Sequence, residues 1–129
     1  MTQKNKFKGF DFIKTSKGID EFILTKNGLK VLLLEDHTAP VTTVMVTYHV
    51  GSRNEAIGYT GSTHLLEHLM FKGSKNYNKE KGTAIWTELQ SIGAQINATT
   101  WNDRTNYFEV VPSEHLEKAI AIEADRMRN

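Results

Sequence analysis

Alternating apolar and polar positions predict strands in the first half of the chain. Two apolar stretches, residues 21–25 and 29–35, flank the pair Asn27-Gly28. Because both of these residues tolerate positive φ, the pair is a strong short-range signal for a β-hairpin. Residues 41–50 form a β-branched run with a period of two, which predicts a third strand. The twenty residues before the hairpin are mixed and polar, and we expect them to form a loosely held lead-in.

The second half of the chain changes to helical spacing and then returns to strands. A helix capped by Ser62 or Thr63 is predicted to run to about Phe71, and a second helix is predicted over residues 79–92. Two strands are predicted next, at residues 95–100 and 104–111, with a polar turn between them. A final helix is predicted after Pro112-Ser113.

The order of these elements predicts the α+β class. We expect a largely antiparallel mixed sheet with helices on one face. Residues 1–20 are assigned to the N-terminal lead-in, and residues 21–129 to one partial domain. The last predicted helix reaches Asn129 without a stop signal, so we expect the domain to be truncated at its C-terminus.

Composition narrows the class of protein. The chain has 129 residues, 24% charged and 39% hydrophobic, which is typical of a globular domain. A net charge of +1 provides no basic excess for nucleic acid or an anionic membrane, and no apolar run approaches the ~18 residues of a membrane span. The absence of cysteine excludes a disulfide scaffold and a thiol nucleophile. No secretory signal follows the basic start, so the compartment stays open between cytoplasm and, if a signal was removed, the bacterial periplasm or export.

The segment most informative about chemistry is residues 61–71, which contains His64, Glu67 and His68. At ~100° per residue, the two histidines lie one helical turn apart on one face, with the carboxylate beside them. The apolar residues occupy the opposite side of the helix, and we expect them to anchor it in a core: Leu65, Leu66, Leu69 and Met70.

Two histidines at i and i+4 can direct ring nitrogens to one zinc ion. A carboxylate on the adjoining position can reach a metal-bound water without ligating the metal, and can take its proton during attack on a carbonyl. The arrangement of His64, Glu67 and His68 therefore favours a metal site over an exposed polar helix face that happens to hold two histidines.

The spacing H-x-x-E-H is the inverted zinc motif of the inverzincins. Its context resembles the M16 (pitrilysin, insulinase or mitochondrial processing peptidase-like) zinc metallopeptidases, and the resemblance runs from about Glu21 to the end. The matching segments are Val50-Gly-Ser-Arg-Asn-Glu, Gly61 to Ser74, Gly93-Ala-Gln-Ile-Asn-Ala-Thr-Thr, Thr105-Asn-Tyr-Phe and Glu123-Ala-Asp-Arg-Met.

This resemblance implies a zinc-dependent metalloendopeptidase that hydrolyses peptide bonds of extended peptides or unfolded proteins, with one Zn²⁺ per catalytic domain. It implies that His64 and His68 are the Zn²⁺ ligands and that Glu67 is the general base. It also implies that Asn97 and Ala98 contact substrate through an edge strand. It also implies a third ligand, a glutamate roughly 75 residues after His68 and so beyond Asn129, and a second homologous half, fused or as a separate subunit. Glu123 matches the preceding helix instead. We expect the 129-residue chain alone to be inactive.

Two other functions stay open. A non-catalytic M16-like partner or scaffold subunit would share the fold, although such subunits usually lose the zinc motif that is intact here. A metal-dependent lyase of the S-ribosylhomocysteine lyase type shares H-x-x-E-H, but its metal site uses a cysteine and this chain has none.

Overall fold

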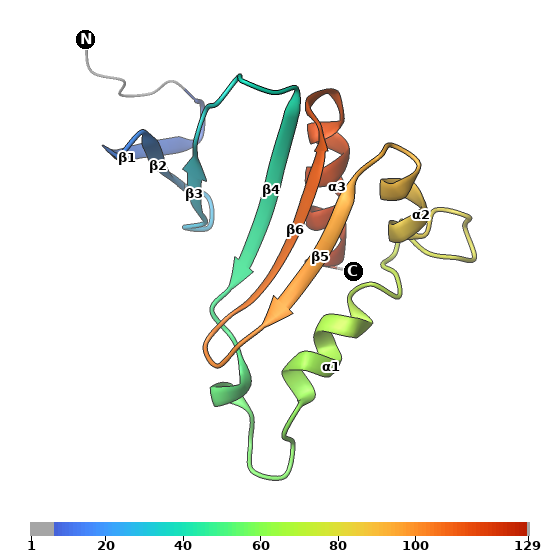
Figure 1. Ribbon diagram of the computed structural model, residues 1–129. Helices are drawn as coiled ribbons and strands as arrows, with labels where there is room; N and C mark the ends of the chain where they lie inside the picture. Colours follow the sequence, from blue (N-terminus) through green and yellow to red (C-terminus); the bar gives the residue numbers. More distant parts are fainter. Residues whose placement is uncertain (1–6, 129) are drawn as a thin grey trace. The chain divides into compact units, whose positions relative to one another are not determined.

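The computed structural model describes residues 7–128 and divides into two compact units, one ending at Ala39 and one beginning at Pro40. The first unit is an antiparallel sheet in which three strands pair in chain order. In Figure 1 these strands are β1 (Phe10–Ser16), β2 (Ile19–Leu24) and β3 (Lys30–Leu33).

The hairpin between β2 and β3 agrees with the sequence prediction. Gly28 has a φ of 75° and its N–H donates to the Leu24 carbonyl at 2.8 Å. The expectation of a loosely held lead-in is wrong for Phe10–Ser16, which forms β1. Lys17 and Gly18, with φ of 52° and 83°, make the tight turn that pairs β1 with β2, because two positive φ values match the twist of a two-residue hairpin.

The second unit is a sheet of three strands with three helices. Its strands pair in the order β4-β6-β5, and both pairings are antiparallel. Its elements are β4 (Val41–Tyr48), α1 (Ser62–Leu69), α2 (Ile85–Gln90), β5 (Gln95–Thr100), β6 (Thr105–Pro112) and α3 (Leu116–Arg126), with short 3₁₀ turns at Ser52–Asn54 and Ser113–His115.

Helices cover one face of this sheet. Along β4 the exposed and half-buried positions alternate, as the period of two predicts. The α3 helix contacts β4 and β6, and α2 contacts β5 (Figure 1). The apolar core lies between these layers and consists of Ile85, Leu89, Val111, Ala119 and Ile122. The α+β class and the largely antiparallel pairing with helices on one face are therefore confirmed, with the strands divided between two sheets.

The helix predicted over residues 79–92 is shorter in the structure, where α2 spans only Ile85–Gln90. Gly82 has a φ of 70°, which interrupts helical backbone. Asn78 also holds residues 79–83 in a turn. Its Oδ1 accepts the Lys81 N–H at 3.0 Å, and its backbone carbonyl accepts the Thr83 N–H at 3.0 Å. These local hydrogen bonds of Asn78 thus replace the first turns of the predicted helix. Within residues 7–128, no helix has the length and apolar composition required to cross a bilayer.

Candidate metal centre

The helix that carries the histidines is held at its N-terminus by Glu55 from the preceding loop. The N-cap residue is Gly61, with a φ of 90°, and neither Ser62 nor Thr63 caps the helix as the sequence had suggested. Instead, the Glu55 carboxylate accepts the N–H groups of Gly61 at 2.8 Å and Thr63 at 2.9 Å, together with the Thr63 hydroxyl. The hydrogen bond from the Thr63 hydroxyl contributes most to lowering the pKa of Glu55, and the two backbone N–H groups lower it further. The negative charge of Glu55 suits the positive end of the helix dipole.

His64 and His68 bring their ring nitrogens together on the exposed side of α1. Their Nε2 atoms are 3.2 Å apart and their ring centroids 4.7 Å apart. Two nitrogens bound to one tetrahedral Zn²⁺ at ~2.0–2.1 Å would be about 3.3 Å apart. The observed separation therefore suits two ligands of one zinc ion.

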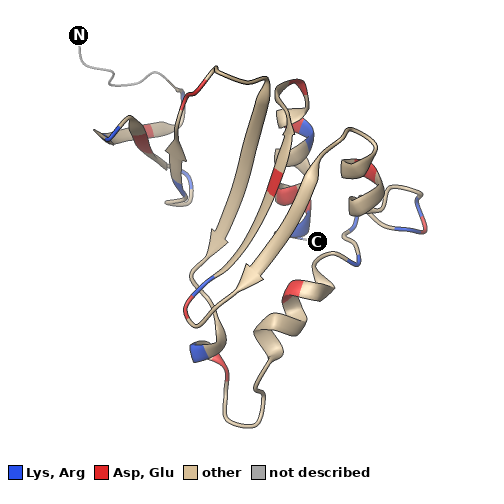
Figure 2. Ribbon diagram, viewed as in Figure 1, with Lys and Arg blue, Asp and Glu red and all other residues tan. Residues whose placement is uncertain are grey.

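Glu67, unlike the two exposed histidines, is buried against the sheet. It is 8% exposed, and its Oε2 accepts a hydrogen bond from the Thr100 hydroxyl at the end of β5. Glu67 is the one residue of α1 with a formal charge at neutral pH, since the rest of the helix reads Ser-Thr-His-Leu-Leu before it and His-Leu after it (Figure 2). A buried carboxylate that accepts a hydrogen bond avoids much of the cost of losing water.

The prediction that the apolar side of α1 anchors in a core is wrong in this structure. Leu65, Leu66 and Leu69 are 59%, 54% and 50% exposed. The opposite side turns inward because Glu67 reaches Thr100 and Phe71 stacks near Trp86, with ring centroids 5.4 Å apart.

A pocket of about 250 Å³ opens beside His64. Its walls come from the loop before α1, from the start of α1 and from the turn between β5 and β6. Gly51, at the start of that loop, lies so close to the turn that an added Cβ would be 2.2 Å from the Trp101 carbonyl oxygen. The close approach requires glycine, and it fixes one wall of the pocket.

Among residues 7–128, no three histidine, aspartate or glutamate side chains lie together as a metal site would require. Glu123, the nearest glutamate to the chain end, is 3% exposed and pairs with Arg126. The described residues thus contain two converging imidazoles and a neighbouring carboxylate.

Strand β5 lies at the edge of its sheet, with β6 on one side only. The Trp101 N–H donates to the Arg104 carbonyl at 2.8 Å, so the alternation of an antiparallel ladder directs the backbone groups of Ile96, Ala98 and Thr100 away from β6. The Ala98 N–H donates to Asn97 Oδ1 at 2.9 Å. The outer edge of β5 therefore presents backbone groups, and the Asn97 side chain covers one of them.

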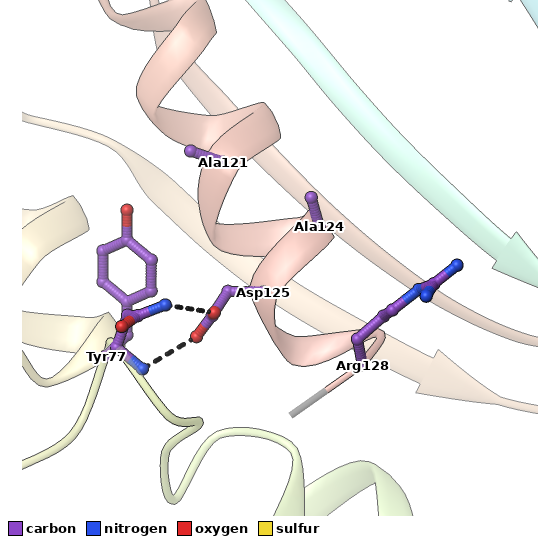
Figure 3. A pocket seen from close by; sticks show the side chains of 6 residues that line it. Tyr77, Ala121, Ala124, Asp125 and Arg128 are labelled. Atoms are coloured by element: carbon purple, nitrogen blue, oxygen red, sulfur yellow. Dashed lines mark hydrogen bonds between the residues drawn. The ribbon is translucent and has the colours of Figure 1, made fainter.

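The segment that follows α1 is fastened to α3 by Asp125. Its carboxylate accepts the Ser74 hydroxyl at 2.5 Å, the Asn76 N–H at 3.0 Å and the Asn76 side-chain N–H at 2.7 Å. The two contacts between Asp125 and Asn76 lie beside an open pocket of about 590 Å³, which Tyr77 and Arg128 also line (Figure 3). None of His64, Glu67 and His68 lines this larger pocket, so it is separate from the histidine pair.

Comparison with known proteins places the chain in a family. Residues 30–129 match the family model described as Insulinase (Peptidase family M16). The chain belongs to peptidase family M16. A zinc protease, PqqE, from Helicobacter pylori is 39% identical over 109 residues, which cover 83% of this chain and 24% of that protein.

Other relatives have different names. Human mitochondrial cytochrome b-c1 complex subunit 1 is 39% identical over 106 residues, which cover 82% of this chain and 21% of that subunit. The crystal structure of a protease from Helicobacter pylori superimposes with a TM-score of 0.77 at 35% identity, over 84% of this chain and 26% of that one. The M16 chain thus spans about a quarter or less of the length of these proteins.

Proposed function

We propose that this M16 chain carries the zinc-binding and proton-transfer residues of a zinc-dependent metalloendopeptidase that hydrolyses extended peptides or unfolded proteins. The observation that carries this proposal is the convergence of His64 and His68, 3.2 Å apart at Nε2, on the helix that also holds the buried Glu67. In this proposal residues 21–129 are part of the catalytic domain and residues 1–20 precede it.

The residues present suit the proposed chemistry. His64 and His68 would hold Zn²⁺, which when bound lowers the pKa of water to about 7 and polarises a carbonyl. Glu67 accepts the proton of the attacking water at its carboxylate. Its connection to Thr100 keeps that carboxylate at the end of β5, next to the pocket that His64 lines.

The proposed site needs groups from outside residues 1–129. A glutamate would complete the three protein ligands of a catalytic zinc site. A second homologous half, fused or in a separate subunit, would cover the site and exclude water. Support for partner subunits comes from the relatives, one of which is named as a subunit of a complex.

Substrate binding is proposed at the free edge of β5. An extended peptide would pair with the outward backbone groups of Ala98, and Asn97 would release the Ala98 N–H when the peptide arrives. Main-chain pairing of this kind accepts many sequences, which suits unfolded proteins.

The test of this function separates metal binding from cleavage. Calorimetric titration of the chain with zinc should show weak binding that needs both histidines, because two protein ligands do not complete a site. In the complete protein, Glu67→Gln should retain zinc and lower kcat for an unfolded peptide by about 10²–10⁴-fold. Loss of zinc from Glu67→Gln would instead make Glu67 a ligand and contradict its proposed role.

A second variant addresses the substrate edge. Ala98→Pro removes an outward N–H that β6 does not need, so we expect weaker peptide binding with zinc binding retained. Peptide affinity measured by fluorescence anisotropy should fall about tenfold, the loss of roughly one hydrogen bond. Unchanged affinity would leave β5 as scaffold only.

The alternative function is a non-catalytic M16 partner subunit. The similarity to cytochrome b-c1 complex subunit 1 favours it. Such a subunit would neither bind zinc through His64 and His68 nor cleave peptide, so the same titration distinguishes the two functions.

A further inference from the structure

One hydrogen bond connects the proposed base to the proposed substrate strand. The Thr100 hydroxyl donates to Glu67 Oε2, joining residues 33 positions apart. Thr100 is half-buried and also lines the pocket beside His64. This hydroxyl therefore lies where α1, the edge strand β5 and the pocket meet.

The neighbouring threonine shows that this arrangement depends on the face of the strand. Thr99 points to the other face of the sheet, where its hydroxyl donates to Asn106 Oδ1 at 2.7 Å. Successive side chains of a strand alternate between faces, so only one of two adjacent threonines can reach α1. The chain thus contains a matched pair of threonines, one that contacts Glu67 and one that does not.

A glutamate side chain has three rotatable bonds, and fixing it costs conformational entropy. A catalytic group must nevertheless be held within about 0.5 Å of its productive position. A hydrogen bond from Thr100 to Oε2 restricts the carboxylate and leaves Oε1 to receive a proton. This requirement gives the hydroxyl a role beyond joining α1 to β5.

We propose that Thr100 is a positioning residue that fixes the Glu67 carboxylate for proton transfer. The proposal rests on the function proposed above, in which Glu67 is the base. Thr100 acts only through Glu67, so its loss lowers kcat and leaves KM and zinc content unchanged. A role limited to packing would instead tolerate valine, which has the same shape without the hydroxyl.

The experiment compares Thr100→Val, Thr100→Ser and the control Thr99→Val. The first readout is NMR of the chain labelled with ¹³C at the glutamate carboxyl carbons, in which Glu67→Gln identifies the Glu67 resonance. We expect this resonance to move in Thr100→Val, to stay near its wild-type position in Thr100→Ser and to be unaffected in Thr99→Val. If Thr100→Val does not fold, Thr100→Ala replaces it in the same comparison.

The second readout is peptide cleavage by the complete protein. We expect kcat to fall about 10–100-fold in Thr100→Val, with recovery in Thr100→Ser. A Glu67 resonance that does not move in Thr100→Val, or a kcat that serine does not restore, would overturn the proposal. If the wild-type protein cleaves no peptide, the function proposed above fails, whereas the NMR comparison still decides whether Thr100 fixes the carboxylate.

Discussion

Two groups of ionisable side chains lie on the helix-covered face of the same sheet, and their environments are opposite. One consists of Glu109, Glu123 and Arg126, which are 0%, 3% and 5% exposed. The other is the histidine pair of α1, which is exposed and whose nitrogens face each other. We refer to the first group as the buried ion cluster.

The members of the buried ion cluster pair with one another, although Glu109 Oε2 and Arg126 Nη1 have no hydrogen-bond partner among the described residues. Arg126 donates from Nη2 to Glu109 at 3.1 Å and from Nε to Glu123 at 3.0 Å. Its guanidinium carbon also lies 4.3 Å from the centre of the Tyr107 ring and 5.3 Å from that of Phe71. Charges removed from water persist only when they are paired, and this group connects α3 to β6 and, through Phe71, to the segment that follows α1.

The histidine pair has no such enclosure. Its two nitrogens converge on a position that no third described acidic or histidine side chain reaches. The difference teaches that a cluster of ionisable residues is structural when its members complete one another, and is a candidate site when they converge and leave coordination incomplete. Three predictions test whether this distinction holds.

The largest effect is expected from Arg126→Met. Removing the guanidinium leaves the buried Glu123 carboxylate and the Glu109 carboxyl group without their partner, and the free energy of unfolding should fall by about 3–5 kcal/mol. Arg128→Met, at an exposed position two residues later, should change it by less than about 0.5 kcal/mol. Urea denaturation of both variants measures the difference, and a loss below about 1 kcal/mol for Arg126→Met would make the cluster dispensable.

The second prediction concerns pH. Burial first, and then the nearby Glu123, raises the pKa of Glu109 from 4.5 to about 9, against the opposing effect of Arg126. The folded state therefore holds a proton that the unfolded chain releases above about pH 4.5, and this contribution to stability declines as pH rises toward 9.

Glutamine at position 109 has nearly the shape of a protonated glutamate and is likewise uncharged. Glu109→Gln should lie within about 1 kcal/mol of wild type at pH 6 and should flatten the decline of stability between pH 6 and 9. Thermal denaturation across this range provides the comparison. An equally steep decline in the variant would assign the pH dependence to other groups.

The smallest effect on stability is expected at the histidine pair. His64→Ala and His68→Ala should each change the free energy of unfolding by less than about 0.5 kcal/mol, since both side chains are exposed. Each should lower zinc affinity at least about tenfold in calorimetry, because one imidazole remains. A large loss of stability with unchanged zinc binding would reverse the comparison between the two groups.

Much of the fold follows from local patterns. The hairpin at Asn27-Gly28, the final helix and the strands predicted at 41–50, 95–100 and 104–111 are present with bounds that differ by at most two residues. Each depends on alternation or on turn residues within a few positions. Strand β1 was missed because its Lys17-Gly18 turn lacks the usual Asn-Gly signal. The second helix was predicted too long because Asn78 forms backbone contacts that periodicity does not reveal.

The candidate site also combines features that local spacing predicts with features that depend on contacts distant in sequence. Spacing alone put His64 and His68 one turn apart with Glu67 beside them, because helical geometry fixes which residues share a face. Which side of that helix turns inward was predicted wrongly, since Thr100 and Phe71 decide it through contacts distant in sequence. Glu55 was missed for a similar reason, because nothing in a loop sequence announces a carboxylate that will cap the next helix.

The sequence by itself determined the α+β class, the family resemblance and the identity of the two converging histidines, since all three reside in local spacing and motifs. Only the tertiary structure decided that Glu67 is buried against β5 and that Glu123 belongs to the buried ion cluster. These features depend on strand order and on contacts across 17 to 33 residues for Arg126 with Glu109 and Thr100 with Glu67. Such pairings arise when separate elements pack together, and no local pattern encodes them.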